Sequence, residues 1–266
     1  MWDIMVNVGT LTEASPMVGG TLELARREGA FVTGLQIVAV DPTYLGTAEA
    51  VGILVAEEVD AEGRRDWWEA LCSRHGVRGE WVALRGLYVA GLAQRSLLAD
   101  LLVCTLPHGA LDGPLTVREV TRVLFTGASP MLLVPEEWEG GLLAKRIAIA
   151  WNGSAEAARA VRAALPLLKH ADEVLVLDGV HEGLRGVDPP ALPLQTWLER
   201  HGVRVHWKHF EARPETGLAL HYEAIAWRAD LLVMGAWGRS RLSELVLGGA
   251  TRWMLGHTRL PLLIAH

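Results

Sequence analysis

An internal repeat constrains the fold of this chain more than any other feature of its sequence. The segment Asp100–Val103 recurs as Asp230–Val233, an offset of 130 residues (230 − 100). Two further pairs of matching segments keep the same order: His75–Arg78 with His201–Arg204, and Ser129–Val134 with Leu260–Ala265. Matches that stay in order with small drifts in offset are typical of a duplicated domain. The sequence therefore predicts two copies of one domain within 266 residues.

The boundary between the copies can also be read from the sequence. The apolar run that closes the first copy ends at Val134, and Pro135–Gly141 is acidic and contains glycine, as linkers often do. Lys145 then precedes the next apolar run. We expect a first domain over 1–135, a linker over 136–145 and a second domain over 146–266.

Each copy alternates short apolar runs with segments of helical periodicity, which predicts α/β domains with doubly wound parallel sheets. Continuous apolar runs such as Leu231–Met234 fit strands that are buried on both faces. The strands expected in the first copy are Ile4–Val8, Phe31–Val40, Arg78–Leu84, Leu101–Cys104 and Met131–Val134. Those expected in the second are Arg146–Ala150, Glu173–Leu177, Val203–His209, Leu231–Met234 and Leu262–Ala265. Helices are expected over Ala155–Lys169, Leu194–Arg200 and Glu215–Arg228 and from about Ala250, with Pro166 bending or shortening the first of these.

Composition excludes several classes of protein. Half of the residues are hydrophobic and 21% are charged, which is unlike a disordered chain. The net charge of −6 argues against a nucleic-acid-binding protein, and no uncharged apolar run is long enough to span a membrane. Cys72 and Cys104 are too few for a disulfide framework, and the first residues lack the pattern of a signal peptide. We therefore expect a cytoplasmic protein.

One constellation in the second copy carries chemistry. Gly235 and Gly238 follow a predicted strand directly, and Gly248 and Gly249 precede the last predicted helix. Glycines let the backbone approach a phosphate closely, and a helix N-terminus supplies free N–H groups and a positive dipole end. Ala250 and Thr251 lie at that N-terminus, and Thr251 adds a hydroxyl. The spacing Gly-x2-Gly-x9-Gly therefore predicts a site for a phosphate chain.

This glycine pattern, with Ala229–Gly238 before it and Leu260–Ile264 after it, resembles the universal stress protein family. The run Ile147–Ser154 is similar to the first strand and turn of that family. The resemblance is strong over 146–266 and weaker over 1–135. It implies a tandem universal stress protein whose two adenine nucleotide alpha hydrolase-like domains are related by a pseudo-twofold axis and pair through their last strands.

The resemblance further implies that ATP, with Mg²⁺, binds in the second copy. Gly235, Gly238 and Gly248 match the family's phosphate loop, and Met234 and Trp237 match the residues beside its first two glycines. Two positions depart from the pattern. Gly249 stands where a Ser or Thr is expected, and Asn152 replaces the Asp that holds adenine. A lost hydroxyl contact typically costs about 0.5–1.5 kcal/mol, which weakens binding without abolishing it.

The first copy departs much further from the family pattern. Gly9 aligns with Asn152, Thr105 and His108 with the first two loop glycines, and Val117 with Gly248, while Glu119 adds a negative charge. We therefore expect the first copy to bind no nucleotide in the family's manner.

The remaining candidates have plainer explanations. His206, His209 and Glu211 lie on a predicted strand, where residues three apart face opposite sides, so no metal site is expected. The recurring tryptophans (Trp67, Trp81, Trp197 and Trp207) are expected to pack in the core. No catalytic base, nucleophile elbow or glycine-rich loop of an ATP pyrophosphatase is evident, so any ATP hydrolysis would be slow and we expect no enzyme.

Two functions follow as hypotheses. The first is an adenine-nucleotide sensor in the stress response, acting as an intramolecular pseudo-dimer or as a homodimer of such chains. The alternative is a stress-response protein that binds no nucleotide and acts through protein contacts. The sequence leaves open which partner it has and whether another ligand binds between the repeats.

Overall fold

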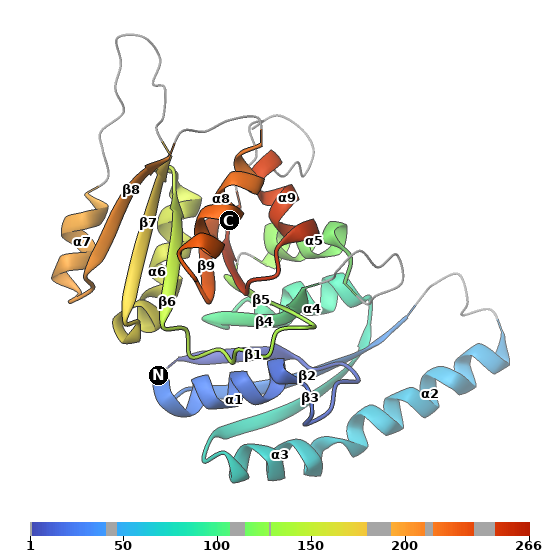
Figure 1. The fold of residues 1–266 in the computed structure, drawn as a ribbon. Helices are drawn as coiled ribbons and strands as arrows, with labels where there is room; N and C mark the ends of the chain where they lie inside the picture. The colour runs from blue at the N-terminus through green and yellow to red at the C-terminus, as the bar shows by residue number, and fades with distance from the viewer. Residues whose placement is uncertain are drawn as a thin grey trace.

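The computed structural model describes residues 2–40, 47–106, 115–127, 129–179, 193–210, 215–236 and 248–266. In this part of the chain, ten strands form one sheet in the order β3-β2-β1-β4-β5-β10-β9-β6-β7-β8 (Figure 1). The first five strands build one half of the sheet and the last five build the other. Within each half every described pairing is parallel. The predicted fold class, with two doubly wound halves, is confirmed.

The elements of the first half alternate as expected. They are β1 (Asp3–Asn7), α1 (Pro16–Glu28), β2 (Phe31–Ala39), α2 (Ala48–Gly63), α3 (Arg65–Arg74), β3 (Arg78–Gly86), α4 (Tyr88–Ser96), β4 (Leu101–Leu106), α5 (Val117–Gly127) and β5 (Met131–Pro135). All five predicted strands are present, with ends that differ by one or two residues. The long helix α2 was not predicted, and it leads away from the sheet at one end of the molecule (Figure 1).

The second half repeats this order. It comprises β6 (Arg146–Trp151), α6 (Ala155–His170), β7 (Glu173–Gly179), α7 (Leu194–Arg200), β8 (Val205–Phe210), α8 (Thr216–Ala226), β9 (Leu231–Gly235), α9 (Gly249–His257) and β10 (Leu262–Ala265). The strand Leu262–Ala265 and the helix Leu194–Arg200 lie where the sequence predicts them. Pro166 does not shorten this helix, because α6 continues through it to His170.

The two halves meet through their last strands. β5 and β10 pair in antiparallel fashion, with Leu262 opposite Leu133, Leu263 opposite Leu132 and Ile264 opposite Met131. The predicted pairing of the last strands is therefore confirmed. Because every other described pairing is parallel, this single antiparallel contact reverses the direction of the second half relative to the first.

Helices cover both faces of the sheet and form a hydrophobic core on each. One core contains side chains of α1, α3, α6 and α7, and the other contains side chains of α4, α5, α8 and α9. The central strands alternate between the two, since Leu263 belongs to the first core and Leu262 and Ile264 belong to the second. Such two-sided burial explains why these strands are continuous apolar runs in the sequence.

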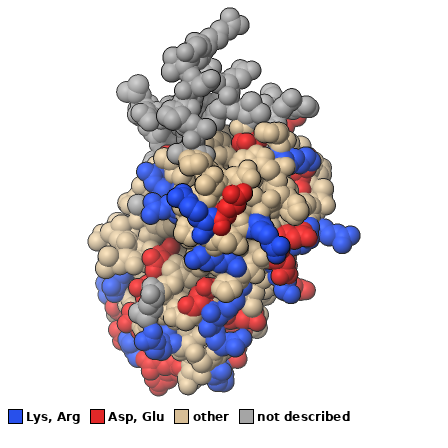
Figure 2. Space-filling model, turned by 90° about the vertical axis from the view of Figure 1, so that its left-hand side faces the viewer, with Lys and Arg blue, Asp and Glu red and all other residues tan. Residues whose placement is uncertain are grey.

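One face of the molecule shows how its charged side chains are distributed. On the face shown in Figure 2, basic and acidic side chains lie side by side. Among the described helices, none is both long and apolar enough to cross a membrane.

Candidate functional site

The candidate site lies where the strand order of the second half changes direction. β6 is flanked by β7 on one side and by β9 on the other, so the chain first builds outward from β6 and then returns to its other edge. In open parallel sheets, ligands bind beyond the carboxyl ends of the strands at such a switch point. The carboxyl ends of β6 and β9 are therefore the place to look for a ligand.

Gly235, the last residue of β9, lies against the first turn of α6. A Cβ atom at this position would stand 2.4 Å from the backbone nitrogen of Ala157 and 2.7 Å from the carbonyl carbon of Glu156. Contacts this short exclude any side chain, so only glycine fits. The end of β9 and the N-terminus of α6 consequently form one compact backbone surface.

The N-terminus of α6 is ordered by its own turn. The Ser154 hydroxyl oxygen accepts a hydrogen bond from the backbone N–H of Ala157 at 3.1 Å, which is a helix N-cap. Asn152, directly after β6, uses its Oδ1 atom to accept from the backbone N–H of Ser154 at 3.1 Å. Gly153 between them has φ +71°, the left-handed conformation that glycine adopts most easily. Asn152 is thus fixed by a turn at the carboxyl end of β6, and its amide N–H groups remain as donors at this edge.

Met234 lies one residue before Gly235 and opposite Ala150 of β6. Its side chain is buried in the core, at 5% exposure. Met234 therefore packs in the core beneath the candidate site and does not present a polar group to it.

The second helix N-terminus at this edge belongs to α9. Gly248 is its N-cap residue in extended conformation without a side-chain cap, and Gly249 is its first residue. A Cβ added at Gly249 would meet no atom within 4 Å, so the position is open. Ala250 is half-buried, whereas Thr251 is 2% exposed and points into the protein. The hydroxyl expected to serve the site is therefore on a buried side chain.

Three predicted positions are not described by the structure. Trp237 and Gly238, and the degenerate-loop residue His108 of the first half, lie outside the described residues.

One further polar group at this edge escaped the sequence analysis. Asp178 pairs with Trp151 near the end of β7, and its Oδ2 atom accepts a hydrogen bond from the indole N–H of Trp207 at 3.1 Å. Its only signal in the sequence is a carboxylate at a strand end.

The equivalent place in the first half can be located from strand register. Ile4 pairs with Leu101 as Ile147 pairs with Leu231, so offsets of 143 (147 − 4) and 130 (231 − 101) place Gly9 at Asn152 and Thr105 at Gly235. This agrees with the alignment made from sequence. The Thr105 hydroxyl contacts the sulfur of Met17 on α1 at 3.6 Å, so a side chain stands where the second half has none.

Arg64 lies beside Gly9, at the place in the first half that is equivalent to the candidate site. Its guanidinium donates hydrogen bonds to the carbonyl oxygens of Gly9 and Leu11, and to Oε1 of Gln36 at 2.9 Å. It also lies 4.6 Å from the ring centroid of Trp67 and 5.2 Å from that of Trp81, both within range of a cation–π interaction. Burial lowers the pKa of Arg64, and the nearby Asp60 opposes that shift. Sequence reasoning missed this residue, since the partners of its hydrogen bonds are 28 to 55 positions away along the chain.

The other residues considered from sequence lie as follows. His206 and His209 are exposed on β8, Glu211 lies outside the described residues, and within the described part of the chain no three His, Cys, Asp or Glu residues gather as metal ligands. Trp81 is buried at 1% exposure, while Trp67, Trp197 and Trp207 are partly buried against the core, which confirms their packing role.

Comparison with known proteins is consistent with this geometry. Residues 144–266 match the sequence model of the Universal stress protein family. The crystal structure of a universal stress protein from Archaeoglobus fulgidus DSM 4304 matches 99% of this chain and 95% of its own, with a TM-score of 0.73 and 15% identity. A functionally unknown protein from Pseudomonas aeruginosa PAO1 matches 99% of this chain and 92% of its own, with a TM-score of 0.62 and 14% identity. Among curated proteins, none matches the chain in sequence. Residues 144–266 therefore form a domain of the universal stress protein family, and the full length of the chain has the fold of a solved structure of that family.

Proposed function

We propose that this universal stress protein binds an adenine nucleotide, ATP with Mg²⁺, through its C-terminal half. The observation that carries the proposal is the contact of Gly235 with the first turn of α6, where a Cβ would stand 2.4 Å from the nitrogen of Ala157. This contact holds the end of β9 directly beside the N-terminus of α6, whose free N–H groups and positive dipole end favour a phosphate.

The surroundings of Gly235 support the proposal. The N-terminus of α9 follows β9 in the chain, so the parallel topology brings it to the same edge of the sheet as the N-terminus of α6. The positive ends of two helix dipoles then favour a negatively charged group. In this arrangement Gly248 and Gly249 would serve the phosphates, whereas Asn152 would bind the base at the end of β6.

The first half argues for one site per chain. Thr105 occupies the position of Gly235, and the Arg64 side chain bonds to the backbone of Gly9, which occupies the position of Asn152. A base could enter only by displacing a guanidinium that makes hydrogen bonds and two cation–π contacts.

Calorimetric titration of MgATP into the full chain, first freed of any retained nucleotide, tests the proposal. We expect one nucleotide bound per chain. The variant Gly249→Glu places a carboxylate in open space at the first position of α9, where an acidic residue is favourable for the helix. Because the carboxylate repels phosphate at short range, affinity should fall by about tenfold or more.

Arg118→Glu is the matched control. An offset of 131 (262 − 131, from the β10 and β5 registers) places Arg118 at the position of Gly249, and Arg118 is exposed at the start of α5. We expect this variant to bind MgATP as the unaltered chain does. Absence of binding in the unaltered chain, together with absence of retained nucleotide, would contradict the proposal and favour a protein that acts through protein contacts alone. Equal losses in both variants would contradict the placement of the site.

A further inference from the structure

The pseudo-twofold relation creates two equivalent clefts between the halves. Each cleft is bounded on one wall by the segments that precede two neighbouring strands, with Asp100 and Pro130 in one cleft and Asp230 and Pro261 at the same positions of the other. The opposite wall is a helix of the other half. In the first cleft it is α6, with Ala163 in the lining; in the second, α1 reaches the cleft at Gly20, which is the position equivalent to Ala163 (163 − 143) and lies against Leu142.

The linker of the protein occupies one of these clefts. Leu142 is 4% exposed and Ala144 is 6% exposed, and a Cβ on Gly20 of α1 would stand 2.9 Å from the Leu142 Cγ atom. The Lys145 N–H then donates to Asp230 Oδ2 at 2.8 Å. Beside this segment only about 10 Å³ of space remains. A short loop segment with an aliphatic side chain therefore fits this cleft closely.

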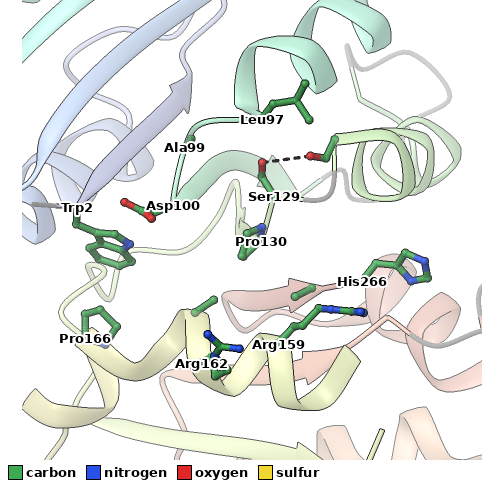
Figure 3. Close-up of a pocket in the computed structure, with 13 residues that line it drawn as sticks. Trp2, Leu97, Ala99, Asp100, Ser129, Pro130, Arg159, Arg162, Pro166 and His266 are labelled. Carbon is green, nitrogen blue, oxygen red and sulfur yellow. Dashed lines mark hydrogen bonds between the residues drawn. The ribbon is translucent and has the colours of Figure 1, made fainter. Parts of the chain in front are cut away.

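The other cleft is open. It has a volume of about 470 Å³ and runs between α6 and the segments before β4 and β5 (Figure 3). Trp2 lies at one end and His266 at the other, while Asp100 and Pro130 face α6 across the groove (Figure 3). His266 is the equivalent of Pro135 (135 + 131), the residue from which the linker leaves toward the filled cleft.

The helix wall of the open cleft carries two positive charges at positions that are uncharged in the helix wall of the filled cleft. Arg159 and Arg162 of α6 line it, whereas the equivalent positions of α1 are Pro16 and Gly19. Both arginines are exposed, and the carboxylate paired with Arg159 is Glu156 of its own helix, at a distance of 3.9 Å. On the opposite wall, one oxygen of Asp100 accepts the N–H of Asp3 at 2.8 Å. The groove therefore has two cationic groups on its α6 wall and one carboxylate, Asp100, on the opposite wall, and Ala163, Pro130 and Pro166 are among its apolar lining residues.

We propose that this groove binds a short segment of a partner protein in which an aliphatic residue follows acidic residues. The filled cleft shows the backbone path and the aliphatic side chain that such a space accepts, as Leu142 does there. The arginines add a requirement for acidic groups, which guanidinium binds in forked geometry. The groove lies at the amino ends of β4 and β5, which is the same edge of the sheet as the carboxyl ends of β9 and β10, because β5 and β10 are antiparallel. The proposal nevertheless does not rest on nucleotide binding, because Asn152, Gly235, Gly248 and Gly249 do not line the groove.

The linker sequence itself provides the probe. A fluorescein-labelled peptide of residues 135–145 carries Glu136, Glu137 and Glu139 ahead of Leu142. We expect its fluorescence anisotropy to rise and saturate when the full chain is added. We also expect a peptide with Gln at the three acidic positions to bind more weakly, and the acidic peptide to bind in the absence of any nucleotide.

Variants of the groove separate charge from shape. Arg159→Glu and Arg162→Glu change exposed positions, and reversing a partly exposed ion pair should weaken peptide binding by about three- to tenfold each. Ala163→Leu narrows the groove without a change of charge and should also weaken binding. Arg26→Glu makes the same charge change at an exposed position of α1 and is the matched control, with unchanged binding expected. Thermal unfolding of each variant checks that the fold is retained.

The proposal is overturned if the acidic peptide fails to saturate the protein below about 1 mM, a weak-binding limit. It is also overturned if the Gln peptide binds equally well, or if Arg162→Glu and Arg26→Glu behave alike. Binding of succinate or inorganic phosphate that depends on Arg162, without binding of the peptide, would identify a small-anion site instead.

Discussion

Leu132 and Leu263 lie directly opposite each other in the antiparallel pair of β5 and β10, and they are equivalent residues of the two halves. The offset of 131 that relates β5 to β10 maps Leu132 onto Leu263, so the pseudo-twofold axis passes through this pair. Both side chains are buried, at 1% and 0% exposure, and both belong to the core that contains α1 and α6. In a single half, β5 or β10 would be an exposed edge strand, and here the two strands pair with each other and cover both edges.

We expect Leu132→Ala and Leu263→Ala to destabilise the protein by similar amounts, about 2–5 kcal/mol each, because each leaves a cavity at the junction. Urea denaturation followed by far-ultraviolet circular dichroism measures the loss. Leu98→Ala, at a position that is 93% exposed, is the control and should change the free energy of unfolding by less than about 0.5 kcal/mol. Small losses at both junction leucines would contradict a packed contact between the halves.

Much of this architecture can be predicted because the repeat and the apolar runs are patterns of residues that are close together in the sequence. The strand Leu262–Ala265 and the helix Leu194–Arg200 have the predicted bounds. The helix α2 (Ala48–Gly63) was missed because its apolar residues do not mark a buried face: Val51, Ile53, Val55 and Val59 are all at least 40% exposed. The role of Arg64 was missed for a different reason. Its contacts with Gly9 and Gln36 depend on how distant segments meet in space, which no local pattern encodes.

The candidate site is only partly predictable for the same reasons. Gly235 and Asn152 end neighbouring strands, and their positions follow from topology. Burial of the Thr251 side chain depends on how α9 packs, which the spacing of glycines does not reveal.

Gly249→Ser should strengthen nucleotide binding in the proposed site. A Cβ at Gly249 meets nothing within 4 Å, so a serine hydroxyl can be added at the start of α9 without a clash. One further hydrogen bond typically contributes about 0.5–1.5 kcal/mol, which corresponds to a two- to tenfold lower Kd for MgATP. Calorimetric titration measures the change. Arg118→Ser, at the equivalent position of α5, should leave the affinity unchanged, and equal effects of both variants would exclude a local contact.

Arg64→Ala should destabilise the first half by about 2–4 kcal/mol, since it removes charge-assisted hydrogen bonds to two backbone carbonyls and a cation held by two tryptophans. Arg64→Lys should be intermediate in stability, because an ammonium group cannot reproduce the planar fork of donors. The free energy of unfolding in urea distinguishes these cases. Arg26→Ala, on an exposed position of α1, serves as the control. A loss in Arg64→Ala no larger than in Arg26→Ala would show that the observed contacts contribute little.

Neither cysteine should react readily while the protein is folded. Burial raises the pKa of the Cys72 thiol to about 11, with a further contribution from Glu69, and burial also raises the pKa of Cys104. Because the thiolate is the reactive form, modification by Ellman's reagent at mildly alkaline pH should be slow in buffer and rapid for both residues in denaturant. Cys72→Ser and Cys104→Ser would assign any reaction that does occur. Fast labelling of one thiol in the native protein would contradict its burial.

His221 should make the protein less stable in mild acid. Burial in α8, and secondarily the positive charge of Arg259, lower the pKa of His221 below its ordinary value of 6.5. Between the lowered pKa and 6.5, the unfolded chain binds more protons than the folded chain. The free energy of unfolding therefore rises with pH across this window, and the contribution of His221 to stability is lost when the pH falls through it. His221→Gln should remove that part of the difference in urea stability between about pH 7.5 and about pH 5. His206→Gln, at an exposed position of β8, is the matched control and should retain the full difference. If His221→Gln retains it as well, the acid sensitivity arises elsewhere in the chain.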